Sequence, residues 1–103
     1  MAQGKDYIGE ELKYAVRITA SGFSMDGDDF EIVVSCGSRK RTYAKEDLLL
    51  DLQGNYYLAI DTSEFKKGDL YATVYAYVPD DDFPDGKRTE IYKTKLTTLN
   101  GLS

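Results

Sequence analysis

Acidic side chains are the most concentrated source of possible chemistry in this sequence, and they gather in two segments. Residues 24–31 contain Asp26, Asp28, Asp29 and Glu31, and residues 77–92 contain Asp80, Asp81, Asp82 and Asp85. A calcium loop supplies oxygen ligands at alternating positions, but Phe30 and Pro84 occupy the third ligand position of the two segments. We therefore predict no metal ion and no cofactor. Aspartates in turns commonly accept hydrogen bonds from nearby backbone amides, and we expect that role here.

The sequence is poor in the groups that enzymes use. It has no histidine and a single cysteine, so it offers no thiolate–imidazole pair, no zinc ligand set and no internal disulfide. Cys36 continues the apolar alternation of Phe30, Ile32 and Val34, which predicts a small buried side chain. Close carboxylates occur only in the two acidic segments, where we expect them to be exposed. We predict that the protein is not an enzyme.

Tyrosine is abundant, with nine residues in a chain of 103. Along a predicted strand at residues 69–78, one side carries Tyr71, Thr73, Tyr75 and Tyr77, and the other carries Leu70, Ala72, Val74, Ala76 and Val78. If the aliphatic side faces the core, the tyrosines face outward, where rigid rings favour a protein–protein interface. A tyrosine ladder on a solvated sheet is the other interpretation. We take the tyrosine side as the candidate interface, first of all with another copy of the chain.

Charge narrows the classes of partner. The net charge of −5 argues against nucleic acid, because that affinity comes largely from neutralising phosphates. No apolar run approaches the roughly 20 residues that span a bilayer, so we predict no membrane insertion. The basic residues 38–45 are interpreted as a solvated edge strand, with phosphate binding as the lesser alternative. The four aspartates at 80–85 are expected to keep a hairpin tip hydrated or to contact a basic surface on a neighbouring subunit.

The elements that must position these residues are predicted to be strands. Apolar and polar residues alternate over residues 12–20, 30–36, 40–44, 55–61, 69–78 and 87–98. Residues 44–51 predict a helical turn or two, and residues 61–68 predict a single turn, capped by Asp61 or Thr62 and ended by Gly68. In the hairpin at 77–92, Asp85 and Gly86 are expected to turn the chain.

Taken together, these elements predict an all-β protein built as one antiparallel β-sandwich domain over residues 1–103, with about six or seven strands. An immunoglobulin-like arrangement fits this number of strands. The tryptophan and the cysteine pair that are typical of true immunoglobulin domains are both missing from the sequence.

The order of motifs resembles a known group of proteins. An opening strand is followed by the strand "DFEIVV" at residues 29–34, a basic strand, the corner "DTSEFKKG" at residues 61–68, a long strand, an acidic hairpin and the return strand "KRTE" at residues 87–90. This order, over residues 12–96, is similar to the immunoglobulin-like β-sandwich modules of tailed-phage and prophage virion proteins. It is similar in particular to the N-terminal modules of baseplate upper proteins and to structural proteins of gut Bacteroidales phages.

The resemblance implies a non-enzymatic virion component, made in the host cytoplasm, that binds copies of itself or other virion proteins. Because the sequence stops at Ser103, without the further region of baseplate upper proteins, a head-fibre anchor, a capsid decoration protein or a small tail or baseplate adaptor fits better. The alternative from the residues themselves is a carbohydrate- or ligand-binding β-sandwich that uses exposed tyrosines.

Overall fold

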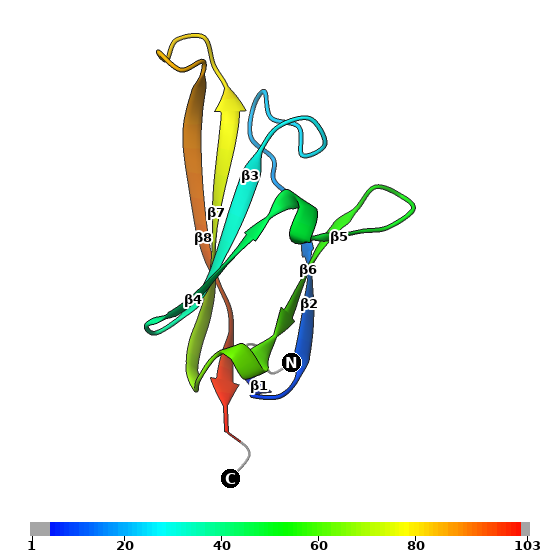
Figure 1. Cartoon of the computed structure of the whole chain (residues 1–103), viewed down its shortest axis with the longest axis vertical. Coiled ribbons are helices and arrows are strands. Elements are labelled where there is room, and N and C mark those ends of the chain that lie inside the picture. The colour runs from blue at the N-terminus through cyan, green and yellow to red at the C-terminus, as the bar shows by residue number, and fades with distance from the viewer. Residues whose placement is uncertain (1–4, 102–103) are drawn as a thin grey trace.

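Two β-sheets make up the protein in this computed structural model, which describes residues 5–101 (Figure 1). The five-stranded sheet has the order β1 (Lys5–Tyr7), β8 (Lys87–Asn100), β7 (Gly68–Pro79), β3 (Phe30–Cys36) and β4 (Arg39–Ala44). The three-stranded sheet has the order β2 (Glu11–Val16), β6 (Tyr56–Asp61) and β5 (Leu49–Leu50). The predicted all-β, sandwich-like character is confirmed.

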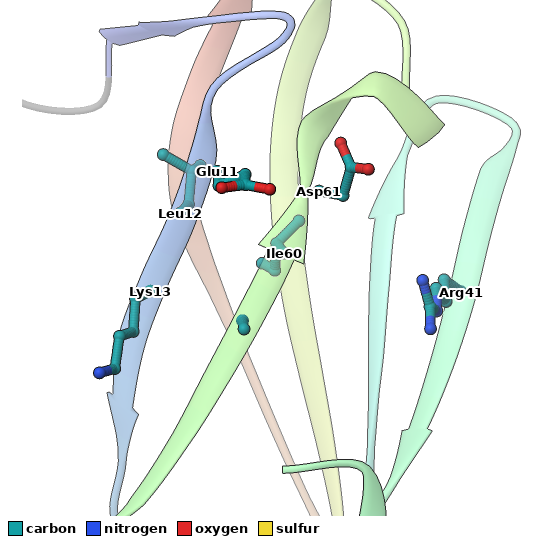
Figure 2. A pocket seen from close by; sticks show the side chains of 7 residues that line it. Glu11, Leu12, Lys13, Arg41, Ile60 and Asp61 are labelled. Carbon is teal, nitrogen blue, oxygen red and sulfur yellow. The ribbon is translucent and has the colours of Figure 1, made fainter. Parts of the chain in front are cut away.

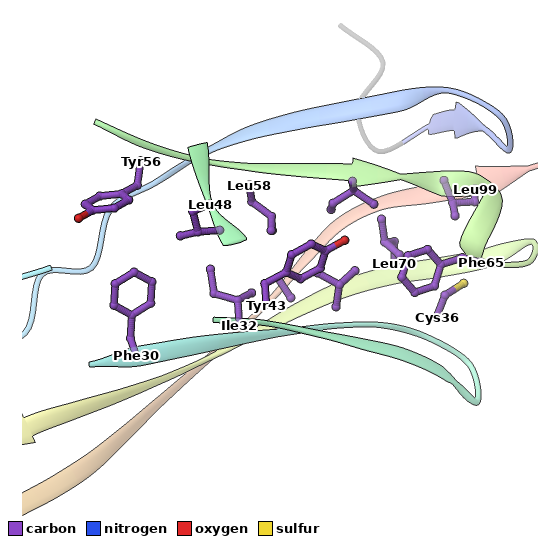
Figure 3. Packing of buried hydrophobic residues seen from close by; sticks show 13 residues of the cluster. Phe30, Ile32, Cys36, Tyr43, Leu48, Tyr56, Leu58, Phe65, Leu70 and Leu99 are labelled. Atoms are coloured by element: carbon purple, nitrogen blue, oxygen red, sulfur yellow. The ribbon is translucent and has the colours of Figure 1, made fainter. Parts of the chain in front are cut away.

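The core lies between the two sheets and follows the period-two pattern of the sequence (Figure 3). Inward-facing residues alternate with outward-facing ones along each strand, because successive side chains of a strand point to opposite faces. The five-stranded sheet contributes the buried Phe30, Ile32, Val34, Cys36, Tyr43, Leu70, Ala72 and Leu99, and the three-stranded sheet contributes Tyr56, Leu58 and Ile60. The buried position predicted for Cys36 is confirmed, and its thiol donates to the carbonyl oxygen of Lys66 at 3.1 Å.

One prediction about the sheets is wrong. β1 pairs in parallel with β8, with Lys5 opposite Thr98 and Tyr7 opposite Asn100, so the five-stranded sheet is mixed rather than wholly antiparallel. All other strand pairs are antiparallel. The pattern did not reveal β1 or β5, because strands of three and two residues are too short to display an alternation.

The predicted strand at residues 12–20 ends earlier, at Val16. Residues 17–29 form a connection instead, in which the amide of Ile18 donates to the sulfur of Met25 at 3.5 Å. The amide of Phe23 donates to the carbonyl oxygen of Ala20 at 3.1 Å, and this bond closes a turn. The apolar pattern therefore continues through Ile18 and Ala20, although these residues pair with no strand among the described residues.

The two helical segments are single 3₁₀ turns, η1 (Lys45–Asp47) and η2 (Thr62–Glu64). Asp61 caps η2 by accepting from the amide of Ser63 at 3.0 Å, as predicted. Gly68 does not end this turn, because η2 is already closed at Phe65. Gly68 instead begins β7 at a φ of +138°, and a Cβ there would lie 3.4 Å from the Cys36 sulfur. Within residues 5–101 no helix is long and apolar enough to cross a membrane.

Candidate functional site

The candidate interface residues Tyr71, Thr73, Tyr75 and Tyr77 all lie on the outer side of β7. Their alternating neighbours Leu70, Ala72, Ala76 and Val78 are buried against the core side, at 5% exposure or less. The aliphatic side of this strand is therefore the inner one. We call the outer surface of the five-stranded sheet around these four residues the tyrosine face. Its four residues are half-buried.

Strand register sets the neighbours of each residue on the tyrosine face. Tyr71 lies between Ser35 and Lys95, Thr73 between Val33 and Lys93, Tyr75 between Glu31 and Ile91, and Tyr77 opposite Thr89. Ile91 is 60% exposed, which is high for a residue of its size. The middle of the face thus combines the Tyr75 ring, Val33 and the exposed Ile91 with the charged side chains of Glu31 and Lys93.

The two ends of the tyrosine face carry different charges. At one end the Tyr77 hydroxyl donates to Oε1 of Glu31 at 2.8 Å, and burial together with this bond raises the pKa of Tyr77. At the other end the Lys93 ammonium lies 4.9 Å from the centre of the Tyr71 ring. Lys95 sits beside Tyr71, and Lys40 on β4 lies opposite Ser35. The Tyr71 end is therefore rimmed by lysines.

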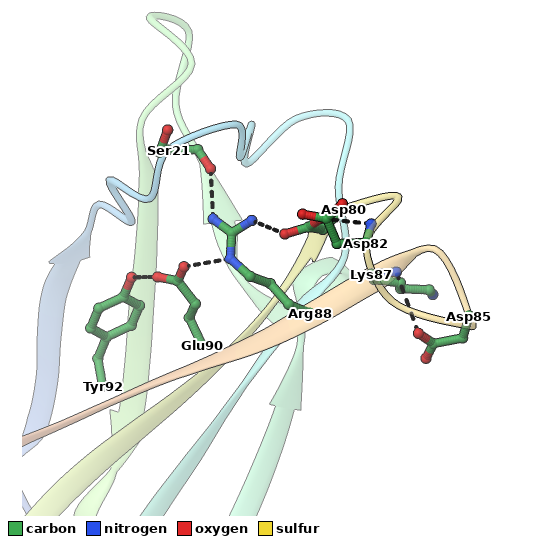
Figure 4. A network of polar contacts seen from close by, with 8 residues as sticks. All are labelled: Ser21, Asp80, Asp82, Asp85, Lys87, Arg88, Glu90 and Tyr92. Carbon is green, nitrogen blue, oxygen red and sulfur yellow. Dashed lines mark hydrogen bonds and ion pairs between the residues drawn. The ribbon is translucent and has the colours of Figure 1, made fainter.

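The four aspartates at 80–85 do not converge on one point. Asp80 accepts from the amide of Asp82 at 3.0 Å and pairs with the Arg88 guanidinium at 2.7 Å (Figure 4). These two contacts lower the pKa of Asp80. Asp85 accepts from the amide of Lys87 at 3.4 Å, whereas Asp81 and Asp82 have exposed side chains. Within residues 5–101 no cluster of His, Cys, Asp or Glu could hold a metal ion.

Arg88 also joins this loop to more distant parts of the chain. Its Nε donates to Glu90 at 2.9 Å and its Nη2 donates to the carbonyl oxygen of Ser21 at 3.1 Å (Figure 4). Glu90 accepts a further bond from the Tyr92 hydroxyl. Arg88 therefore connects the loop to the segment around Ser21, while the carboxylates of Asp81 and Asp82 stay exposed. Asp85 and Tyr77 do border one shallow depression of about 200 Å³, which links the loop to the tyrosine face.

A wider depression, of about 400 Å³, is lined by residues of β2 and β6 in the three-stranded sheet and by Arg41 of β4 in the five-stranded sheet (Figure 2). Glu11 and Asp61 are opposite each other across β2 and β6 at its border. Asp61 accepts from the hydroxyl and the amide of Ser63, which lowers its pKa and keeps the carboxylate ionised at neutral pH. Arg41 is paired with Glu64 at 2.5 Å. The charged groups at this border thus take part in local structural contacts.

A second exposed apolar feature was missed by the sequence patterns. We call residues 46–55, which lead through β5 into the turn before β6, the leucine hairpin. Leu49 is 48%, Leu50 57% and Leu52 101% exposed. The prediction of a helical turn over residues 44–51 hid this feature, because only Leu48 turns into the core. Residues 52–55 indicated a turn in the sequence. A run of apolar residues, however, does not show which of its side chains will be exposed.

Comparison with known proteins gives no relative on which to base a function. No protein-family model, no curated protein and no solved structure matches this chain. A functional proposal therefore depends on the surfaces described above and on the expectation drawn from the order of motifs in residues 12–96.

Proposed function

We propose that this protein is a non-enzymatic structural module of a phage or prophage virion that works through protein–protein contacts. It would act in the assembled particle as a head-fibre anchor, a capsid decoration protein or a tail or baseplate adaptor. The tyrosine face is the observation that carries the contact function. The sequence resemblance carries the virion setting.

The composition of the tyrosine face supports protein contact over a simple solvated sheet. Tyrosine, isoleucine and valine side chains lie in adjacent rows, and Ile91 is largely exposed among them. Interface cores are enriched in aromatic residues, and tyrosine loses little conformational entropy on binding. Residues of β3, β7 and β8 are fixed by strand pairing, so the surface is already organised before a partner arrives.

We also infer that the two sheets form an immunoglobulin-like sandwich. The order β8-β7-β3-β4 supports this, because it corresponds to strands G, F, C and C′, and β2-β6-β5 corresponds to strands B, E and D. The chain crosses between the sheets after β1, β2, β4 and β6, as that topology requires. The tyrosine face is then the outer side of the G-F-C-C′ sheet.

Purified particles provide the test of this function. Cells that encode the chain are treated to induce the phage, and nuclease-resistant particles are banded by density and identified by mass spectrometry. We expect the protein to co-band at a fixed ratio to the main capsid protein. The variant Tyr75→Ser with Ile91→Ser should be made but lost from particles, whereas Lys13→Gln, on an exposed residue of β2 in the three-stranded sheet, should be retained.

Absence of the wild-type protein from the particles would contradict the proposal. If the purified protein then bound a glycan array, and the Tyr75→Ser with Ile91→Ser variant did not, carbohydrate binding through the tyrosine face would replace it.

A further inference from the structure

The leucine hairpin displays apolar side chains that the fold itself does not use. Leu52 is 101% exposed, and Leu49 and Leu50 are each about half exposed. Single exposed leucines are common on protein surfaces, but three within four positions of one hairpin mark a candidate contact site. Leu49 lies opposite Tyr57 and Leu50 opposite Tyr56, so these two leucines face opposite sides of the sheet. In Figure 1 the loop between β5 and β6 projects away from both sheets. Leu52 belongs to this loop, and Leu49 and Leu50 form β5 beside it.

The leucine hairpin is held in one conformation by its own hydrogen bonds. Asp51 Oδ1 accepts from the amides of Gln53 and Asn55, each at 2.9 Å, and Asp51 Oδ2 accepts from the Tyr57 hydroxyl at 3.3 Å. Gly54 turns the chain at a φ of +85°. The leucines are therefore presented by an ordered turn, which reduces the entropy cost of binding.

The charge beside the leucines restricts the partner. Glu46 and Asp47 are exposed, and Asp51 is half-buried, so the leucine hairpin combines apolar side chains with negative charge. A membrane surface rich in anionic lipid would repel it. A complementary partner must offer an apolar surface with positive charge around it.

The lysine-rimmed end of the tyrosine face has these properties. Tyr71, Thr73 and Val33 supply the apolar and aromatic floor, and Lys93, Lys95 and Lys40 border it. Asp69 pairs with Lys95 at 3.3 Å and offsets one of the three lysine charges, so the rim keeps a net positive charge. In a chain of net charge −5, this local basic rim is the complement of the acidic leucine hairpin.

The leucine hairpin cannot reach the tyrosine face of its own chain. The hairpin belongs to the three-stranded sheet, which packs on the inner side of the five-stranded sheet, and the tyrosine face is the outer side. We propose that the leucine hairpin of one copy docks on the lysine-rimmed end of the tyrosine face of a second copy. This inference rests on the proposed function, since it names the partner of the tyrosine face.

Such a contact joins two different surfaces, so it is head-to-tail. Head-to-tail contacts build rings when the rotation closes and filaments when it does not, rather than stopping at a two-fold dimer. The purified protein should therefore form species larger than a dimer as its concentration rises. Raising the salt concentration should weaken the association, because the rim and the hairpin carry opposite charges.

Two variants test the contact by sedimentation velocity. The hairpin variant carries Leu50→Ser and Leu52→Ser, and the face variant carries Lys40→Glu and Lys93→Glu; circular dichroism checks that each keeps its strand signal. Each variant alone should associate at least about tenfold more weakly than the wild type. An equal mixture should form a 1:1 dimer, since the first variant retains its face and the second retains its hairpin.

The possible results separate the two proposals. A wild-type protein that stays monomeric up to roughly 500 μM, or a hairpin variant that associates normally, overturns this inference and leaves the particle experiment to decide the virion function. A mixture that stays monomeric also overturns it. If a double variant unfolds, Glu46→Lys replaces the hairpin variant and must weaken association, with Lys13→Gln on the exposed side of β2 as the matched control.

Discussion

At the scale of single residues, the ring of Tyr43 contributes to the stability of the core, whereas its buried hydroxyl lowers that stability. The side chain is 3% exposed and its ring centre lies 4.8 Å from the Arg41 guanidinium carbon. Its hydroxyl has no hydrogen-bond partner within residues 5–101. A buried hydroxyl that loses water without gaining a partner costs about 1–3 kcal/mol.

We therefore expect Tyr43→Phe to stabilise the protein. The free energy of unfolding in urea should rise by about 1 kcal/mol, because the ring stays and the desolvated hydroxyl goes. Tyr56→Phe is the matched control, since the Tyr56 hydroxyl donates to Asp26 at 3.0 Å and its loss should lower stability. Equal destabilisation by both changes would contradict this account of Tyr43.

At the scale of elements, Thr62 connects η2 to the turn between β1 and β2. Its side chain is fully buried. The Thr62 hydroxyl donates to the carbonyl oxygen of Glu10 at 2.5 Å and accepts from the amide of Gly9 at 2.9 Å. One hydroxyl therefore satisfies two backbone groups of a segment more than fifty positions away in sequence.

Thr62→Val keeps the shape of the side chain but leaves the Gly9 amide without its acceptor, and the Glu10 carbonyl keeps only the bond from the Thr62 amide at 3.2 Å. We expect the free energy of unfolding to fall by about 1–3 kcal/mol. Thr62→Ser retains the hydroxyl and should cost less, through the loss of one methyl group. Thermal and urea unfolding of the two variants provide the comparison. A valine variant as stable as the serine variant would show that the two bonds contribute little.

The same scale explains what the sequence could predict. The alternation over residues 30–36 matches β3 at both ends, and the predicted strand 69–78 is one residue short of β7 at each end. Strands of this length show their buried side directly in the pattern. The parallel pairing of β1 depends on contacts with the far end of the chain, which no local pattern encodes.

The candidate site divides in a similar way. The sequence placed Tyr71, Thr73, Tyr75 and Tyr77 on one side of a strand, and it linked their outward orientation to an aliphatic core. The lysines beside Tyr71 come from β4 and β8, so their position depended on strand order and register. The exposure of Leu50 and Leu52 could not be predicted, because apolar runs look the same whether they are buried or displayed.

At the scale of the whole molecule, Arg88 holds three separate segments together at one end. Its guanidinium contacts Asp80 in the hairpin loop, Glu90 on β8 and the Ser21 carbonyl in the connection after β2. The pKa of Asp80 is lowered by the Asp82 amide and by Arg88, and that of Glu90 by Tyr92 and by Arg88. Both carboxylates are thus more acidic in the folded state than in the unfolded state.

This network makes stability depend on pH in the acid range. A carboxyl whose pKa is lower in the folded state stabilises the protein fully at pH values above its ordinary pKa, which is 3.8 for Asp80 and 4.5 for Glu90. This stabilisation is lost as the pH falls through the pKa of the folded state. We expect Arg88→Gln to reduce the slope of melting temperature against pH below about pH 5. The exposed Arg17→Gln serves as control, and an unchanged slope in the Arg88 variant would contradict the network.

The parallel pairing of β1 with β8 has a mechanical consequence. β1 lies near the start of the described chain and β8 near its end, and Thr97 donates to Asp6 at 2.6 Å between them. Tension that pulls these two ends apart acts along the strands in opposite directions. The bonds between β1 and β8 are then sheared together instead of opening one after another. A module linked into a larger assembly through both ends would resist pulling at this short ladder first.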